Sequence, residues 1–383
     1  MDLKNTIRYV VSRNAFLKKH VTMRKIAKKR KYMFSDEQVM ASEKDDQTRQ
    51  KLLDEFRKKN PVYVAKFEAE AMEILRKSQG EVNATCYDML WCYLAYGFQQ
   101  DEYIMFGFKD KDSVYRRSFI SDVERYDIYY RNNNLYDRMV LINKYDTYKK
   151  FGKFYGREII KVESERDFYA FQNFIAYHKK IVVKNPILSR GDSVHAIDCS
   201  DLSQDETKKL FKDIIRGESA IVEEMIVQGK ELSIFHPDSV NTLRCTTIVR
   251  DGDVIVFYPF IKMGQFGMFV DNGGKGGILA GVDAETGRVC SDGLDESGVE
   301  YVTHPNTGIL ISGYQLPMWN KCLELVKECA RSIPSVRVVG WDVAWSDKGW
   351  VIVEGNAQGQ FVGQQSTIKK GLKKELGEAL GRY

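Results

Sequence analysis

Apolar residues recur at helical spacing through the first third of the chain. In residues 46–59 and 62–76 they return every three or four positions among charged side chains, which predicts two amphipathic helices. Few glycines or prolines interrupt the first 130 residues. We therefore expect a mainly helical region over residues 1–134.

The pattern changes after Asn132-Asn133-Asn134, where short β-rich runs begin to alternate with helical stretches and glycines become frequent. The runs at 181–183 and 220–226 predict buried strands, and residues 204–216 and 317–332 predict helices. No internal repeat accompanies this alternation. The second part of the chain should therefore combine sheet and helix.

Two further pairs of strands are predicted to form hairpins. The runs at 241–249 and 254–263 flank Asp251-Gly252, a dipeptide suited to a tight hairpin turn. The runs at 336–345 and 350–356 are joined by Asp347-Lys348-Gly349.

The second hairpin carries the most informative pair of residues. Asp342 and Glu354 are equidistant from Lys348, so a three-residue loop centred there would place them directly opposite each other. Asn356 follows at strand spacing and should share their face. The same alternation places three valines on the other face: Val343, Val351 and Val353.

Two opposed carboxylates repel each other, so a cation should lie between them. Two acids and an amide oxygen are hard ligands that suit Mg²⁺ completed by phosphate and water. The alternative is an acidic hairpin whose charge is balanced by a nearby Lys or Arg. Spacing alone leaves both open.

Two weaker signals concern phosphate and adenine. Lys184 leaves the predicted strand at 181–183 and precedes the small-residue loop 189–193, so its ammonium and the loop's N–H groups suit a phosphate. The acidic strand end Glu223-Glu224 could hold adenine. Each pattern by itself is also typical of an ordinary strand end.

Composition limits the class of protein. The chain has 383 residues, 43% of them hydrophobic and 29% charged, which is typical of a globular protein of two or three structural units. It has no apolar run long enough to span a membrane and no signal-peptide pattern. Seven cysteines without C-x-x-C spacing indicate reduced thiols rather than disulfides or a zinc site. We expect a cytoplasmic protein.

Positive charge is concentrated at the amino terminus. Residues 1–34 contain eleven Lys or Arg and one acid, Asp2, while the whole chain has a formal charge of only +5. Apolar residues recur among these cations at roughly helical intervals. Such a helix could lie on the inner face of an anionic membrane, or pack one face on its own domain. No nucleic-acid recognition module accompanies it, so we expect no nucleic-acid partner.

Taken in order, these signals resemble the ATP-grasp superfamily. Lys144, Lys184, the Glu223-Glu224 strand and the D-x11-E-x-N hairpin follow the order of those enzymes. Residues 135–370 are similar, more closely, to sugar-transfer-associated ATP-grasp proteins. The specific motifs are Ser239–Arg244, Val270–Gly277, His304-Pro305, Gly340-Trp341-Asp342 and Glu354-Gly355-Asn356.

The resemblance implies an α+β ATP-grasp fold, in which two α+β subdomains clasp ATP. We expect the first subdomain at 135–218 and the second, with the metal site, at 219–383, after the helical region 1–134. Two features depart from the pattern of ligases like D-alanine–D-alanine ligase. Those enzymes carry an arginine where this chain has Gly340, and they begin with an α/β domain.

The resemblance also implies roles for individual residues. The expected ATP contacts are Lys144 and Lys184 with phosphate, Glu223 with the adenine amine, the backbone of Glu224, Met225 and Ile226 with the ring edge, and Glu231 with the ribose. Asp342, Glu354 and Asn356 would hold Mg²⁺. Arg244 and Lys184 are the candidate catalytic residues, which would stabilise the charge of the transferring phosphate, although Arg244 could instead pair with an acid on a neighbouring strand.

The expected reaction is amide formation between a carboxylate and an amine through an acyl phosphate. The carboxylate is expected to be a small molecule or linked to a glycan, for example a surface-polysaccharide precursor. Candidate substrate contacts are Asn241, Asn272, Gly273 and Gln358, and the loop 273–277 could fold over the site. An ATP-dependent phosphotransferase and a nucleotide-binding scaffold remain the alternatives.

Overall fold

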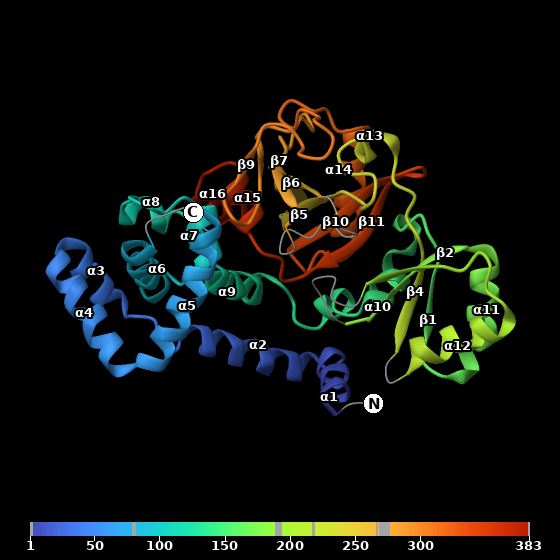
Figure 1. Cartoon of the computed structure of the whole chain (residues 1–383), viewed down its shortest axis with the longest axis horizontal. Helices are drawn as coiled ribbons and strands as arrows, with labels where there is room; N and C mark the ends of the chain where they lie inside the picture. The colour runs from blue at the N-terminus through green and yellow to red at the C-terminus, as the bar shows by residue number, and fades with distance from the viewer. Residues whose placement is uncertain are drawn as a thin grey trace.

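The computed structural model describes residues 3–78, 82–187, 194–216, 219–265, 267 and 276–381. Its first part is helical, as the sequence predicts, and two antiparallel sheets follow (Figure 1). In this first part the helices are α1 (Leu3–Ser12), α2 (Ala15–Arg30), α3 (Asp36–Lys44), α4 (Asp46–Lys59), α5 (Pro61–Ser78), α6 (Val82–Tyr96), α7 (Gln100–Met105), α8 (Ser113–Arg117) and α9 (Asp122–Asn132). Among the described residues, no helix is long and apolar enough to cross a membrane.

The short helices of this region have defined starts. The Ser35 hydroxyl accepts from the backbone of Gln38, whose side chain accepts from Ser35 N–H, so a capping box begins α3. Asp45 caps α4 by accepting two backbone N–H groups. Both helices turn apolar side chains inward, including Val39, Leu53 and Phe56. The predicted helix at 46–59 is therefore confirmed.

A 3₁₀ turn (Asp137–Leu141), α10 (Lys144–Phe151) and a second 3₁₀ turn (Gly152–Phe154) lead into a four-stranded sheet. Its strands are β1 (Ile159–Val162), β2 (Lys180–Lys184), β3 (His195–Asp198) and β4 (Ala220–Glu224), in the order β1-β4-β2-β3. A third 3₁₀ turn (Glu165–Asp167), α11 (Phe168–Tyr177) and α12 (Gln204–Ile215) complete this part. Phe171, Phe174 and Phe211 from the two α-helices pack on the apolar face of the sheet.

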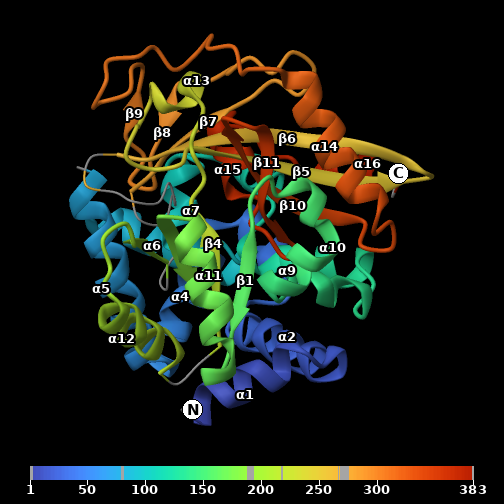
Figure 2. The same ribbon diagram turned by 90° about the vertical axis from the view of Figure 1, so that its right-hand side faces the viewer.

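The remaining strands form a seven-stranded sheet in the order β11-β10-β5-β6-β7-β8-β9. Their bounds are β5 (Thr242–Arg250), β6 (Asp253–Met263), β7 (Ile278–Gly281), β8 (Gly293–Leu294), β9 (Glu300–Tyr301), β10 (Val338–Ser346) and β11 (Gly349–Asn356). The helices are α13 (Lys230–Ser233), α14 (Trp319–Arg331), α15 (Val362–Thr367) and α16 (Lys373–Ala379). In Figure 2, α14 lies on one side of this sheet and the first helices lie on the other.

The helical region shares its core with the large sheet. One apolar cluster joins side chains of α3–α7 to Phe260 of β6, Leu279 of β7 and Val362 of α15. The buried Gln365 side chain also accepts from Ile120 N–H and donates to Ile120 C=O. The subdomain limits at 134 and 218 remain predictions, and contacts cross the first of them.

Both predicted hairpins form. Arg250 pairs with Asp253 across Asp251-Gly252, and the two turn residues have φ of 52° and 87°, as a two-residue hairpin turn requires. The second hairpin also turns in two residues, Asp347-Lys348, because Ser346 pairs with Gly349. The predicted three-residue loop is therefore wrong.

A β-bulge nevertheless brings the two acids opposite each other. Val343 pairs with Ile352, but the register then shifts by one residue and Asp342 pairs with Glu354. The extra residue is Val353. The prediction that Val351 lies on the face opposite Asp342 is wrong. Val351 pairs with Ala344 and so lies on the Asp342 side of the sheet.

Candidate active site

Asp342, Glu354 and Asn356 converge on one face of the β10–β11 hairpin. The Asn356 amide nitrogen donates to Asp342 Oδ2 at 3.2 Å and to Glu354 Oε1 at 3.0 Å. Asp342 is 3% exposed, whereas the other two side chains are half-buried. The predicted convergence of two acids and an amide is thus present.

Two cations from neighbouring strands pair with Asp342. Arg244 on β5 donates from Nε and Nη2 to the two carboxylate oxygens at 2.6 and 2.9 Å. Lys262 on β6 lies 3.2 Å from Asp342 Oδ1. Burial would raise the pKa of Asp342, but Arg244 and Lys262 hold this pKa well below its usual range. The alternative to a metal between the acids is a nearby Lys or Arg that balances their charge, and Arg244 and Lys262 are such cations at Asp342.

Gly340 makes room for the Arg244 side chain. A Cβ atom at position 340 would lie 3.2 Å from Arg244 Cδ, closer than ordinary van der Waals contact. Asp342 lies opposite Arg244 on the adjacent strand, so the guanidinium reaches its partner by crossing over Gly340. This chain has Gly340 at the position where an arginine is expected from ligases like D-alanine–D-alanine ligase. An arginine of the neighbouring strand β5, Arg244, lies beside the same acid instead.

A second charged group lies on the small sheet. The Glu223 carboxylate is buried on β4 and accepts from Lys184 of β2 at 3.0 Å and from Arg157 at 2.9 and 3.1 Å. Burial raises the pKa of Glu223, but Lys184 and Arg157 together hold it below its ordinary value. Glu223 therefore remains ionised and is already paired with two cations, Lys184 and Arg157.

Arg157 joins this group to the β-bulge of the large sheet. Its guanidinium donates to Ile352 C=O at 2.7 Å and to Val353 C=O at 3.4 Å, as well as to Glu223. A bulge places two successive residues opposite one, so both carbonyls can face the same donor. Arg157 was missed in the sequence because it precedes β1 outside any recognised motif.

Lys144 lies near residues of both charged groups. Burial lowers its pKa, Glu354 and Glu223 raise it, and Lys184 lowers it further, so all four groups are near one another. Lys144 begins α10, and its N–H donates to Pro186 C=O at 2.9 Å, just beyond β2. Together the two groups contain five basic side chains (Lys144, Arg157, Lys184, Arg244 and Lys262) and three carboxylates (Glu223, Asp342 and Glu354).

A cavity of about 620 Å³ opens beside this cluster. Strand β2 contributes Lys184 and Val182, β4 and the residues after it contribute 223–228, and the large sheet contributes Thr242 and Val353. Of the residues predicted to bind ATP, Lys184, Glu223, Glu224, Met225 and Ile226 line it. Its walls combine apolar side chains such as Val182 and Ile226 with charged ones such as Lys184, which suits a nucleotide base and its phosphates.

Glu231 and Asn241 have other partners in this structure. The Glu231 carboxylate is exposed and accepts from Trp345 Nε1 at 2.6 Å, and it does not line the cavity. Asn241 is fully buried, and its amide nitrogen contacts oxygens of Gln228, Leu232 and His236. The structure thus gives Asn241 a packing role rather than a position at the cavity.

Of the other predicted substrate contacts, the structure describes only Gln358. Gln358 follows the β10–β11 hairpin, and its C=O accepts from Arg125. Its side chain is half-buried, and the amide nitrogen, which is buried, has no hydrogen-bond partner in the part of the chain that the structure describes. Asn272 and Gly273, with the loops 189–193 and 268–275, lie outside the described residues.

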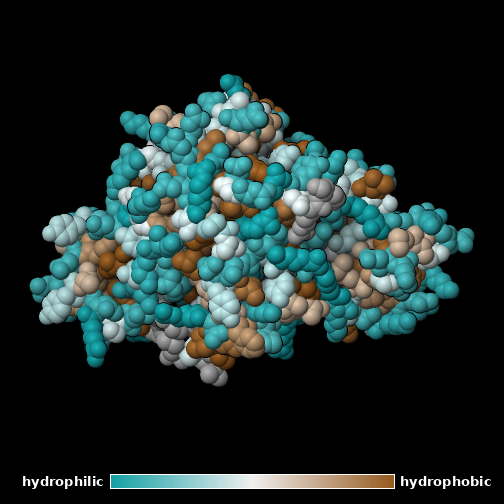
Figure 3. Space-filling model, turned by 180° about the vertical axis from the view of Figure 1, so that it is seen from behind, coloured by the Kyte–Doolittle hydropathy of each residue, from teal (hydrophilic) through white to brown (hydrophobic). Residues whose placement is uncertain are grey.

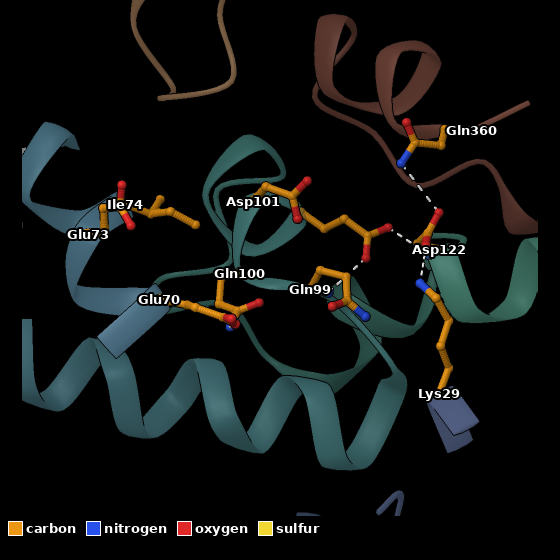
Figure 4. Close-up of a pocket in the computed structure, with 10 residues that line it drawn as sticks. Lys29, Glu70, Glu73, Ile74, Gln99, Gln100, Asp101, Asp122 and Gln360 are labelled. Atoms are coloured by element: carbon orange, nitrogen blue, oxygen red, sulfur yellow. Dashed lines mark hydrogen bonds and ion pairs between the residues drawn. The ribbon is translucent and has the colours of Figure 1, made fainter. Parts of the chain in front are cut away.

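A second cavity, of about 460 Å³, lies among the first helices and is strongly acidic (Figure 4). Glu70, Asp101, Glu102 and Asp122 line it, and Gln360 donates to Asp122 at 3.3 Å. Burial raises the pKa of both Asp101 and Glu102, and their mutual repulsion adds to the shift at Glu102. These acids are separate from the charges around Asp342.

The donor set on the hairpin fits a hard divalent cation. In the described part of the chain no three His, Cys, Asp or Glu side chains cluster as metal ligands. Asp342, Glu354 and Asn356 offer two carboxylates and an amide, which leaves positions for phosphate and water, as Mg²⁺ sites in nucleotide enzymes commonly do. A cation here would require Asn356 to present its oxygen in place of its nitrogen.

Comparison with known proteins identifies the segment that carries this hairpin. The family model described as sugar-transfer associated ATP-grasp matches residues 195–379. No curated protein matches the chain. Lys144 and Lys184 precede the matched segment.

Solved structures similar to this chain include three from different organisms. D-alanyl-alanine synthetase A from Vibrio cholerae has 10% identity and a TM-score of 0.39, covering 64% of this chain and 65% of that chain. D-alanine–D-alanine ligase from Bacillus anthracis has 12% identity and a TM-score of 0.40, with 65% and 69% covered. N5-carboxyaminoimidazole synthase from Aspergillus clavatus has 8% identity and a TM-score of 0.41, with 69% and 58% covered.

The chain thus spans just under two thirds of the Vibrio cholerae structure. The family match contains the motif residues Arg244, Asp342, Glu354 and Asn356, which the structure brings together. Residues 195–379 of this chain therefore match the sugar-transfer associated ATP-grasp family, and the chain has an α+β fold of two antiparallel sheets preceded by a helical region.

Proposed function

We propose that this protein is an ATP- and Mg²⁺-dependent ligase that joins a carboxylate to an amine through an acyl phosphate. The observation that carries the proposal is the charge cluster between the two sheets. Five cations around three carboxylates, beside a partly apolar cavity, suit a polyphosphate and its base.

The nucleotide is proposed to occupy the cavity of about 620 Å³. Its base would lie against Met225 and Ile226, where the end of β4 offers backbone groups to a ring edge. Lys184, which lines the cavity, and Lys144, which is near Lys184 and Glu223, would then meet the phosphates. Glu223 would chiefly hold Lys184 in place, since it is buried and already paired.

Asp342, Glu354 and Asn356 would hold Mg²⁺, which when bound would neutralise phosphate charge as the reaction proceeds. Arg244 would turn part of its guanidinium to the transferring phosphate, and Lys262 lies beside it for the same purpose. These groups position reactants and stabilise charge, and no covalent enzyme intermediate is needed.

The proposed reaction has two steps. A substrate carboxylate oxygen attacks the γ-phosphorus of ATP, forming an acyl phosphate and releasing ADP. The nitrogen of an amine then attacks the acyl carbon, phosphate leaves, and the nitrogen loses a proton as the amide forms. The family description supports a carboxylate carried by a sugar or glycan precursor as the first substrate to test.

The deciding experiment incubates the full chain with ATP, Mg²⁺, uronic acids and a panel of amino acids. ADP release together with a product whose mass equals both substrates minus water is the expected result. ADP with a stable phosphorylated product would identify a phosphotransferase instead. ATP binding without any ADP release across the panel would favour a scaffold.

Matched variants locate the activity. Arg244→Lys keeps the positive charge but loses the two-pronged contact with Asp342, and we expect turnover to fall on the order of 100-fold. Arg337→Lys is the control, because Arg337 lies at the far end of the same sheet and donates to Val249 and Leu380 C=O. Equal losses in both variants would contradict a role for Arg244 in the reaction.

A further inference from the structure

Exposed apolar side chains form a strip along α1 and α2. On α2, Phe16, Met23 and Ala27 are exposed and follow the spacing of one helix face, with His20 between them. Phe16 is 62% exposed and Met23 is 44% exposed. On α1, Ile7 and Val10 are 55% and 51% exposed. Hydrophobic side chains accordingly gather along the lower edge of the molecule, where α1 and α2 lie (Figures 1 and 3).

Cations line both sides of this strip. Lys19, Arg24, Lys28 and Lys31 are exposed on α2 or directly after it, and helical geometry places them beside the apolar face. Arg24 and Lys28 form no ion pair within the described part of the chain. Residues 3–34 contain no acid. The exposed face is therefore both apolar and strongly positive.

An adjoining side of α2 is fixed to the protein, which determines what the strip faces. Ala15, Thr22 and Ile26 are buried, and α2 packs against α9. Lys29 and Arg30 form ion pairs with Asp122 and Asp127 of α9. The strip containing Phe16 and Met23 therefore cannot turn inward without breaking these contacts.

Positive charge beneath α2 adds to that of the strip. Arg138 is 1% exposed, and its guanidinium nitrogens have no hydrogen-bond partner among the described residues. Lys18 of α2 lies near it, and burial, Lys25 and Arg138 all lower the pKa of Lys18. No carboxylate contributes to the shift at either group. An anion close to this end of α2 would relieve an existing repulsion.

We propose that α1 and α2 dock the protein on a membrane surface rich in anionic phospholipids. Phe16, Met23, Ile7 and Val10 would enter the boundary between headgroups and acyl chains, while the flanking cations meet the phosphates. A nucleic acid would satisfy the cations but would leave the apolar strip in water. This proposal does not depend on the nucleotide site.

The test measures flotation of the full chain with vesicles. Vesicles with about 30 mol% phosphatidylglycerol in phosphatidylcholine should bind it, and pure phosphatidylcholine should bind at least about tenfold less. About 1 M salt, where the screening length is about 3 Å, should release it. Equal binding to both vesicle types, or none to either, would overturn the proposal.

Paired variants separate this face from general charge. Arg24→Glu with Lys28→Glu should lower binding at least about tenfold, whereas Lys66→Glu with Lys374→Glu makes the same charge change at side chains 78% and 81% exposed elsewhere. Phe16→Ser with Met23→Ser should also lower it, with Val62→Ser and Val114→Ser, 84% and 76% exposed, as controls.

Equal losses in the control pairs would contradict the proposal. So would binding of a DNA duplex that depends on Arg24 and Lys28 while vesicles are ignored. Circular dichroism of every variant should be unchanged, because all the replaced side chains are exposed and α2 keeps its ion pairs with α9.

Discussion

At the residue scale, the two acids of the β10–β11 hairpin are not a simple repelling pair. Asp342 is buried between Arg244 and Lys262, while Glu354 is half-buried and receives one hydrogen bond from Asn356. Removing a buried carboxylate between two half-buried cations leaves these cations uncompensated. Replacing each acid by its neutral amide should therefore change the stability by different amounts, although the two acids are equidistant from Lys348 in the sequence.

We expect Asp342→Asn to lower the free energy of unfolding by about 3–5 kcal/mol, because it breaks a buried ion pair. Glu354→Gln should change it by less than about 1 kcal/mol, because that carboxylate is half-buried and better solvated than Asp342. Urea denaturation without nucleotide measures both. A more stable Asp342→Asn protein would mean that repulsion between the acids outweighs the pairing with Arg244.

Lys184 offers a second test at this scale. Lys184→Ala should weaken ATP binding by about 2–4 kcal/mol if its ammonium meets phosphate in a desolvated cleft. Adenosine has no phosphate and should bind the variant and the parent almost equally. Calorimetry with both ligands decides, and Lys180→Ala, on the same strand and cavity, is the matched control. Equal losses of ATP and adenosine would assign Lys184 to the fold.

At the element scale, helix α7 carries in its first turn an acid, Asp101, that destabilises the fold in its ionised form. Acids in a first turn usually stabilise a helix. Here burial raises the pKa of Asp101, and the charge of Asp122 raises it further. Because the folded-state pKa is raised, ionised Asp101 costs stability, and the cost appears as pH rises through the unfolded and then the folded pKa.

Asp101→Asn should therefore raise the melting temperature at pH 7–8, and its advantage should vanish below about pH 3, where Asp101 is protonated in both states. Thermal unfolding followed across this range measures the effect. Asp205→Asn, at a fully exposed side chain in the first turn of α12, should show no such gain. An advantage that persists at low pH would attribute the effect to packing.

The elements themselves were largely predictable from sequence. The strands at 181–183, 220–226, 241–249 and 254–263 and the helices at 46–59 and 204–216 are present, because their periodicity and turn residues act locally. The bulge at Val353 was not predictable, since it depends on pairing across the sheet. Asp342 and Glu354 were placed opposite each other through a wrong loop, whose extra residue lies in the bulge instead.

The candidate site could be predicted only in part, for a related reason. Residues in motifs, such as Lys184 and Asp342, were found from their order along the chain. Arg157 and Lys262 complete the cluster from positions without a motif, and only the packing of the two sheets brings them there. Conversely, Asn241 lies in a motif but is buried in a packing role.

At the scale of the whole molecule, the first helices and the large sheet form one folding unit. Their shared core includes Phe260 and Leu279, and Gln365 links α15 to Ile120 before α9. Lys373 N–H also donates to Ser118 C=O. Such contacts make independent unfolding of the helical region unfavourable.

Thermal unfolding should therefore show a single transition by both far- and near-ultraviolet circular dichroism. Gln365→Ala should lower the free energy of unfolding by about 2–3 kcal/mol, because it leaves the buried backbone groups of Ile120 without partners. The transition should stay single in the variant. Two separate transitions in the parent protein would show that the helical region is an autonomous domain.

The pairing of Asp342 with Arg244 and Lys262 has a consequence for the order in which ligands arrive. A free Mg²⁺ would meet a carboxylate whose charge is already balanced, so it should associate weakly with the empty protein. Polyphosphate would offer both cations other partners and release Asp342. On the proposed function, metal and nucleotide affinities are therefore thermodynamically linked, each strengthening the other by the same factor. The resting ion pairs would thus favour entry of the metal together with its nucleotide.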